Sequence, residues 1–276
     1  MKKNTKIALA IIIGGVIFSA VVYVVFRLYF TNNPIVLCGD DKYSTGCLVK
    51  YATDLNLAKK PFIDCVNGNS TDNVIAEDVN AGTALQLASG PALFVGQITD
   101  NTNFTGFFVS VSTYTELKAV EDNVLNKGLT FAETENLKTT TEKINANVKQ
   151  YLDGQGFTGD KYNQELAKIQ PDVDKYLASF KMFNIQMKMN SIRGNADSKV
   201  AILYFADYGS QYTSSINSIL LAPAIADYVD GGKAALVVKE WPESSDLTDS
   251  KKLAAAALCA GVQQKYFEYT DFLSTL

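Results

Sequence analysis

Residues 199–239 read KVAILYFADYGSQYTSSINSILLAPAIADYVDGGKAALVVK, and this stretch decides the fold. The run Lys199–Phe205 is apolar after its first residue, and a second apolar run covers Ala234–Lys239. Short, unbroken apolar runs are typical of buried strands in a parallel sheet. Between them, Ser210–Val229 has the pattern of a helix. Strand, helix and strand in this order predict a right-handed crossover unit of an α/β fold.

Three blocks follow the first thirty residues of the chain. The last block, 190–276, contains the crossover unit and ends with an alanine-rich helix at 249–263. In the first block, 33–126, the patterns predict helices at 48–57, 71–87 and 114–125 and a strand hairpin formed by 91–96 and 104–111.

The middle block, 127–189, is rich in Lys, Glu, Asn, Gln and Thr. It predicts one or two helices, around 136–152 and 162–180. Pro171 is expected to kink the second helix or to lie in its first turn. We interpret this block as a helical linker that packs only lightly.

Block 190–276 carries a series of short motifs in a definite order. They are LYFADYGSQYT at 203–213, KEWP at 239–242, LAAAALCA at 253–260 and QKYFEYTDFL at 264–273. The series resembles the N-terminal half of a DsbA-like thioredoxin-fold oxidoreductase. That family has a strand, then Asp-(Phe/Tyr)-x-Cys-Pro-x-Cys, a long helix, a strand and an alanine-rich helix with a cysteine.

The chain lacks the residues that carry the redox chemistry of that family. Ser210 and Thr213 occupy the two cysteine positions, Gln211 occupies the proline position and Thr270 that of the usual histidine. Disulfide exchange needs a thiolate at the start of the helix, and a hydroxyl cannot replace it near neutral pH. We therefore expect no dithiol catalysis here, and we expect Ser210 to cap the helix.

Block 33–126 resembles the C-terminal half of the same fold. Leu48–Leu57 and Phe62–Cys65 are similar to the helical insertion of the family, and Tyr114–Leu117 to the start of its last helix. Ala88–Gly96 is similar to the loop that carries a cis-proline facing the active site. The resemblance implies that Pro91 follows a cis bond, with Gly90 in place of the usual Thr or Val.

The two halves thus stand in reversed order, which predicts a circular permutation. Residues 190–276 and 33–126 are expected to form one α/β, thioredoxin-like domain with a helical insertion, and 127–189 to span the gap. The resemblance then implies a Cys65–Cys259 bridge between the halves. The alternative is a pair of degenerate half-domains completed by exchange in a swapped homodimer.

The chain has four cysteines, Cys38, Cys47, Cys65 and Cys259, and no histidine. An even number of cysteines in an exported domain is compatible with two disulfides, and Cys38 and Cys47 bracket a turn-rich loop. The lack of histidine excludes Ser-His and Cys-His catalysis and removes the commonest metal ligand. The sequence therefore predicts no metal and no cofactor.

An uncharged, largely apolar run from Ile7 to Phe26 follows Lys2, Lys3 and Lys6. Its length gives roughly 30 Å of helix, which matches the hydrocarbon core of a bilayer. A cleaved signal peptide is the rival, but its apolar part is usually shorter and no clean cleavage site follows. We expect residues 1–30 to be a single-pass anchor with a cytoplasmic N-terminus and an extracytoplasmic domain.

Beyond residue 30 the chain has 21 basic and 29 acidic residues, a net charge of −8. This balance argues against nucleic acid as a partner. The leading hypothesis is a binding or scaffolding protein that holds an extended peptide or an exported protein. The expected surface consists of Gly90, Pro91, Ser210, Gln211, Tyr212 and Thr213. Three alternatives remain. The surface binds nothing; Cys38 and Cys47, or Cys65 and Cys259, exchange disulfides with partner thiols; or the helical middle block serves in assembly.

Overall fold

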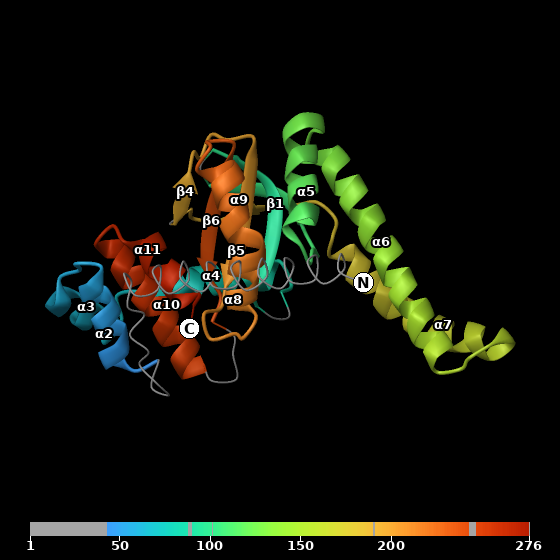
Figure 1. Cartoon of the computed structure of the whole chain (residues 1–276), viewed down its shortest axis with the longest axis horizontal. Helices are drawn as coiled ribbons and strands as arrows, with labels where there is room; N and C mark the ends of the chain where they lie inside the picture. Colours follow the sequence, from blue (N-terminus) through green and yellow to red (C-terminus); the bar gives the residue numbers. More distant parts are fainter. Residues whose placement is uncertain (1–42, 88–89, 101, 190, 243–246, 276) are drawn as a thin grey trace, which may run out of the picture. The chain divides into compact units, whose positions relative to one another are not determined.

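The computed structural model describes residues 43–275 except 88–89, 101, 190 and 243–246 (Figure 1). Within this part, six strands form one mixed sheet in the order β3-β2-β1-β5-β6-β4. The strands are β1 (Ala92–Thr99), β2 (Asn103–Phe108), β3 (Phe183–Gln186), β4 (Ile192–Gly194), β5 (Val200–Ala206) and β6 (Ala234–Glu240). The predicted α/β class is confirmed.

The helices around the sheet come from all three blocks. They are α2 (Thr45–Asp54), α3 (Lys59–Val66), α4 (Asp72–Ala84), α5 (Tyr114–Lys127), α6 (Leu129–Gly154), α7 (Gly159–Ala178), α10 (Leu247–Val262) and α11 (Tyr266–Leu273). One further helical stretch consists of α8 (Thr213–Ile216), η2 (Asn217–Leu221), α9 (Ala222–Ala224) and η3 (Ile225–Val229), of which η2 and η3 are π-helical.

The centre of the sheet is the strand pair that the apolar runs predict. β5 and β6 are parallel, from Val200 opposite Ala234 to Ala206 opposite Glu240. Every residue of both strands is buried. β1 lies antiparallel to β5, with Ala92 opposite Phe205, and β2 lies antiparallel to β1. Blocks 33–126 and 190–276 therefore share one sheet within a single chain.

Helices cover both faces of this sheet (Figure 1). On one face, α5 packs on β1 and β5, and the helical stretch 213–229 packs on β6 and on α5. On the other face, α4 packs over β6. The core under α4 combines aliphatic and aromatic side chains, and its largest members are Phe94, Phe104, Phe205 and Trp241.

The middle block does more than link the halves. β3 extends the sheet by pairing antiparallel with β2, with Phe104 opposite Ile185. Asn136 of α6 donates a hydrogen bond of 3.0 Å to the backbone carbonyl of Phe108, and Phe180 packs edge-on against the Phe108 ring. The interpretation as a lightly packed linker is therefore too simple for the end of the block nearest the sheet.

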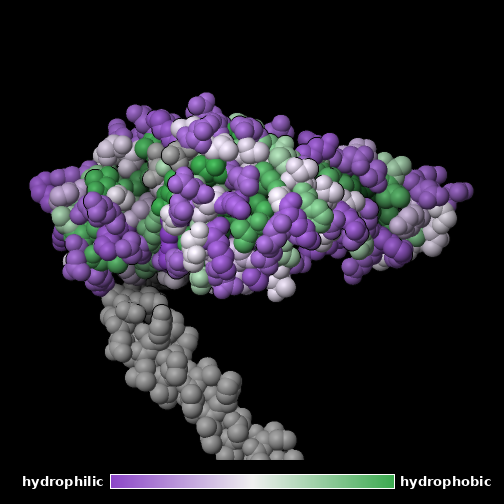
Figure 2. Space-filling view, turned by 90° about the horizontal axis from the view of Figure 1, so that it is seen from above, coloured by the Kyte–Doolittle hydropathy of each residue, from purple (hydrophilic) through white to green (hydrophobic). Residues whose placement is uncertain are grey.

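Farther from the sheet, α6 and α7 form a hairpin (Figure 1). Both are close to the predicted helices, but Pro171 lies in the interior of α7 and not in its first turn. Most side chains of the hairpin are exposed, including Tyr151 and Tyr176. On the face shown in Figure 2, hydrophobic residues occur in small patches separated by hydrophilic ones. This mixture is typical of a water-exposed surface.

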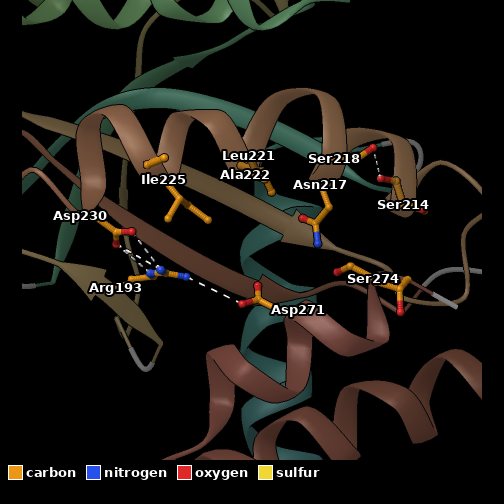
Figure 3. A pocket seen from close by; sticks show the side chains of 12 residues that line it. Arg193, Ser214, Asn217, Ser218, Leu221, Ala222, Ile225, Asp230, Asp271 and Ser274 are labelled. Atoms are coloured by element: carbon orange, nitrogen blue, oxygen red, sulfur yellow. Dashed lines mark hydrogen bonds and ion pairs between the residues drawn. The ribbon is translucent and has the colours of Figure 1, made fainter. Parts of the chain in front are cut away.

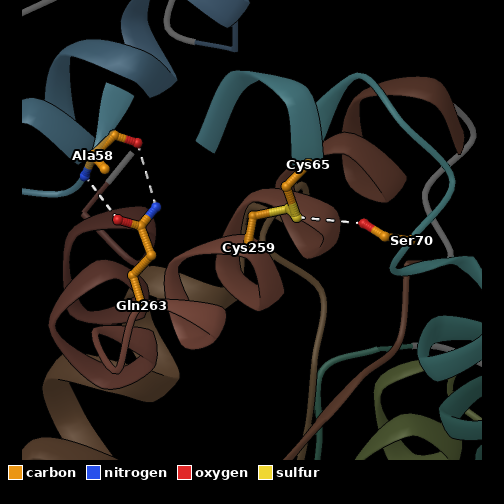
Figure 4. The surroundings of a disulfide bond; sticks show 5 residues. All are labelled: Ala58, Cys65, Ser70, Cys259 and Gln263. Carbon is orange, nitrogen blue, oxygen red and sulfur yellow. Dashed lines mark hydrogen bonds between the residues drawn. A yellow bond between two sulfur atoms is a disulfide. The ribbon is translucent and has the colours of Figure 1, made fainter. Parts of the chain in front are cut away.

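A disulfide joins Cys65 of α3 to Cys259 of α10, as the resemblance implies (Figure 4). Next to it, the Gln263 side chain accepts a hydrogen bond of 2.7 Å from the backbone N–H of Ala58. Across the same interface, the Tyr269 hydroxyl donates to the backbone carbonyl of Leu48 at 2.9 Å. The insertion helices α2 and α3 are therefore held to the C-terminal helices by covalent and polar contacts.

The predicted pairing of Cys38 with Cys47 can be followed only for Cys47. None of the cysteines in the described part of the chain, including Cys47, is a free thiol. Cys38 lies outside the described residues, so its pairing with Cys47 stays a prediction.

Replacing both Cys65 and Cys259 by Ala should lower the free energy of unfolding by about 3–5 kcal/mol, because the bridge closes a long loop. The two cysteines are 194 positions apart in the sequence. Urea unfolding measures the change. Ser70→Ala is the matched control, since the Ser70 hydroxyl lies 3.5 Å from the Cys65 sulfur without belonging to the bridge. An equal loss of stability in both variants would contradict the assignment.

A buried carboxyl lies where α5 meets the stretch 213–229. Glu121 is fully buried, and neither carboxyl oxygen has a hydrogen-bond partner within the described part of the chain. Burial raises its pKa to about 8, and the negative charges of Asp122 and Asp227 act in the same direction, while Lys118 opposes them. Hydrogen bonds surround the carboxyl, for example from the Tyr114 hydroxyl to Asp227 at 2.5 Å.

Because its pKa is higher in the folded than in the unfolded chain, Glu121 should make the protein less stable as the pH rises from about 4.5 to about 8. Glu121→Gln should therefore raise the unfolding free energy by about 2–4 kcal/mol at pH 7.5 and by less than about 1 kcal/mol at pH 5. Denaturant unfolding at the two pH values tests this. Exposed Glu142→Gln is the control, and the same shift at both pH values would refute the explanation.

The predicted membrane anchor, residues 1–30, lies outside the described residues. Among the helices that are described, none has the length and apolar character needed to cross a bilayer.

Candidate functional site

The loop after β5 is organised by Asp207, whose side chain is buried. Its carboxylate accepts hydrogen bonds from the backbone N–H of Gly209 at 3.0 Å and from the Ser250 hydroxyl at 2.8 Å. Its backbone carbonyl accepts from the N–H of Ser210 at 3.0 Å and from the Thr213 hydroxyl. One acidic residue thus holds both ends of the turn that leads into the helix.

The predicted roles of Ser210 and Thr213 need correction. The helix begins at Thr213 with Tyr212 at the N-cap, and no side chain caps it. Ser210 instead accepts a hydrogen bond of 3.3 Å from the backbone N–H of Tyr212, within the turn. Thr213 is only 2% exposed, so its side chain is buried beneath the loop and is not part of a peptide-facing surface.

Gln211 and Tyr212 do face solvent, as expected for a binding surface. The Tyr212 side chain is 60% exposed. Farther along the same helical stretch, Ile216 is half-buried and Ile219 is 50% exposed. Residues at this spacing lie on one side of a helix, so Tyr212 and the two isoleucines extend an apolar strip away from the loop.

The peptide bond between Gly90 and Pro91 is cis, which confirms the expectation for Pro91. Gly90 lies directly against the Asp207 loop. A Cβ atom on Gly90 would be 2.7 Å from Cδ1 of Trp241 and 3.3 Å from the Cβ of Asp207. The structure therefore brings these predicted residues of the two blocks together, and Trp241 leaves little room for a side chain at position 90.

Trp241, the one tryptophan of the chain, is the residue that the sequence argument missed. It is 7% exposed and packs edge-on against Phe205 of β5. It also fills the space beside Gly82 of α4, where a Cβ would come within 2.2 Å of the indole ring. Two glycines, 82 and 90, thus make room for one indole. This packing could not be predicted from the sequence, because the three residues belong to separate segments of the chain.

A buried polar layer lies next to this site at the end of β6. Glu240 is 1% exposed, and burial raises its pKa well above the usual range. The Tyr266 hydroxyl donates to it at 2.6 Å. Lys239 and Asp78 form a buried ion pair at 2.8 Å, and Asp78 also accepts from the backbone N–H of Glu240 at 3.0 Å.

The side chains of Lys239, Asp78 and Glu240 are buried, and each has a polar partner. Desolvation raises the pKa of Asp78 even though Lys239 is paired with it. Where the chain is described, no set of acidic, cysteine or histidine side chains is arranged to hold a metal ion. What the loop offers to a partner is hydrogen-bonding groups and aromatic surface.

No family model, curated protein or solved structure matches the chain.

Gly90→Ala should destabilise the fold by about 1–3 kcal/mol, because a methyl group has to displace the indole. It should also change the emission of Trp241, which reports on this site alone. Gly154→Ala at the end of α6 is the control, since a Cβ there meets nothing within 4 Å. The packing argument is wrong if the two variants unfold at the same denaturant concentration with unchanged emission.

Proposed function

We propose that this chain is a membrane-anchored, extracytoplasmic protein with a permuted thioredoxin-like fold, which binds an extended peptide without dithiol catalysis. Three observations support the fold. The parallel pair β5 and β6 is connected by a helix, β1 and β2 form an antiparallel hairpin beside it, and a cis-proline precedes β1. This is the arrangement expected for the two halves of the DsbA-like family, joined here in reversed order.

The intramolecular arrangement also has support. β1 pairs with β5 of the same chain, and the Cys65–Cys259 bridge connects the same two blocks. A swapped homodimer would need these contacts between two chains. The disulfide further supports a location outside the reducing cytoplasm, in agreement with the anchor that residues 1–30 predict.

The contact between the Gly90–Pro91 loop and the Asp207 loop carries the functional proposal. It places Pro91 beside a turn from which Gln211 and Tyr212 project into solvent. Extended peptides bind such positions through backbone hydrogen bonds, while exposed aromatic residues provide contact area. Neither contribution requires a thiol, so binding can persist with hydroxyl groups in place of the cysteines.

The apolar strip formed by Tyr212, Ile216 and Ile219 indicates the kind of peptide. Its exposed surface favours a partner with an aliphatic or aromatic side chain next to the segment that pairs with the loop. Disulfide exchange remains an alternative prediction, but no observation favours it, since no described cysteine is a free thiol.

A test is titration of the purified protein with short unstructured peptides that differ only in a central Leu, Phe, Ser or Asp, followed through Trp241 emission and NMR. We expect saturable binding of the Leu and Phe peptides, weakened about tenfold by Tyr212→Ala. Tyr151→Ala on α6, where the side chain is 56% exposed, is the matched control. The proposal fails if no peptide gives saturable binding, or if both variants behave alike.

A further inference from the structure

A pocket of about 410 Å³ lies beside the helical stretch 213–229 (Figure 3). α11 forms its opposite wall, through Asp271 and Ser274, and β4 contributes Arg193 at one end. A smaller cavity of about 20 Å³ shares Asn217 and Ser274 with it and reaches down to Tyr204 of β5. Together they form a depression that leads from the surface to the sheet.

The deep end contains a polar group that the protein leaves unsatisfied. Tyr204 is 2% exposed, and its hydroxyl makes no hydrogen bond within the described part of the chain. The Thr213 hydroxyl is its polar neighbour, but Thr213 donates its own proton to the backbone carbonyl of Asp207, so the Tyr204 oxygen receives no proton from it. Burying a hydroxyl without a partner is costly, and a cavity of this size holds one water-sized group. A ligand hydroxyl would satisfy Tyr204.

Asn217 supplies a second uncommitted group. Its side chain projects from the helix into the space above Ser274 (Figure 3). The amide makes no hydrogen bond to any described residue, whereas the nearby Ser218 hydroxyl is bonded to the Ser214 carbonyl at 2.8 Å. An amide can donate and accept at once, which suits a hydroxyl group.

The helical stretch 213–229, which forms one wall of the pocket, contains two π-helical segments. Asn217–Leu221 and Ile225–Val229 are π-helical, and Pro223 lies between them. Proline lacks the N–H that an α-helix would use at this position, so the hydrogen-bond pattern shifts around it. π-Helical turns occur frequently at functional sites. Here Asn217, Leu221 and Ile225 all line the pocket.

The charged residues at the rim of the pocket indicate whether a neutral or a charged ligand fits. Arg193 donates to Asp230 with two nitrogens, at 3.1 Å and 3.3 Å, and its charge is therefore neutralised. Asp271 lies 4.0 Å from Arg193 and leaves the rim with a surplus negative charge, which disfavours anions. The uncommitted groups are neutral, and Leu221 and Ile225 add an aliphatic wall.

We propose that this pocket binds a neutral, hydroxyl-rich molecule of about the size of one sugar ring. One hydroxyl reaches Tyr204, another meets the Asn217 amide, and the C–H face of the ring lies on Leu221 and Ile225. The volume is suited to such a ligand. The site does not depend on the peptide surface, so either proposal can fail alone.

The test is saturation-transfer NMR and calorimetry on the full chain, in a detergent without a sugar head group. The probes are glucose, N-acetylglucosamine and inositol, with glucose 6-phosphate as the anionic comparison. We expect saturable binding of at least one neutral probe, at least tenfold weaker binding of the phosphate, and about a tenfold loss of affinity in Tyr204→Phe and in Asn217→Ala.

Ala226→Trp on η3 should fill the pocket mouth and abolish binding, because Ala226 is exposed and lines the pocket. Ala146→Trp, at an exposed position of α6, is the matched control and should bind as the parent does. If Ala226→Trp does not fold, the affinities of the Asn217→Ala and Tyr204→Phe variants test the proposal instead. Absence of saturable binding by all three neutral probes, a preference for the phosphate, or unchanged affinity in folded pocket variants overturns the proposal.

Discussion

The antiparallel ladder between β1 and β5 is the contact on which the rest of the molecule depends. It pairs Ala92 with Phe205 and Gly96 with Ala201, and so joins blocks 33–126 and 190–276 in one sheet. Phe94 lies in the aromatic core formed across this ladder, next to Phe205. Because the Gly90–Pro91 turn directly precedes β1 and the Asp207 turn directly follows β5, the ladder also sets the two loops side by side.

The geometry of this loop pair is maintained by Asp207 and Trp241. Asp207 fixes one turn through backbone hydrogen bonds, and Trp241 supports the other by packing against Gly90. The Thr213 hydroxyl donates to the Asp207 carbonyl, which gives this side chain a structural role in the turn.

The sequence predicts the parts of the fold in which local pattern and burial agree. β5 and β6 are buried on both faces, so their apolar runs are unbroken and easy to recognise. β3 and β4 are short and only partly buried, and their formation depends on an adjacent strand that local sequence cannot reveal. The relation between Gly82, Gly90 and Trp241 and the burial of Glu121 are likewise tertiary effects. The family resemblance predicted that the Gly90–Pro91 loop and the 210–213 loop lie together. The burial of Thr213 could not be predicted from the sequence.

The disulfide has a mechanical consequence. Cys65 and Cys259 are 194 residues apart in sequence, so the bond connects α3 directly to α10. A pulling force applied between the two ends of the described chain passes through α2 to α3 and then through the covalent bond to α10. The strands between these two points, including the ladder of β1 and β5, lie outside this load path. The sheet and both candidate surfaces would then be shielded from tension on the segment that leads to the predicted anchor.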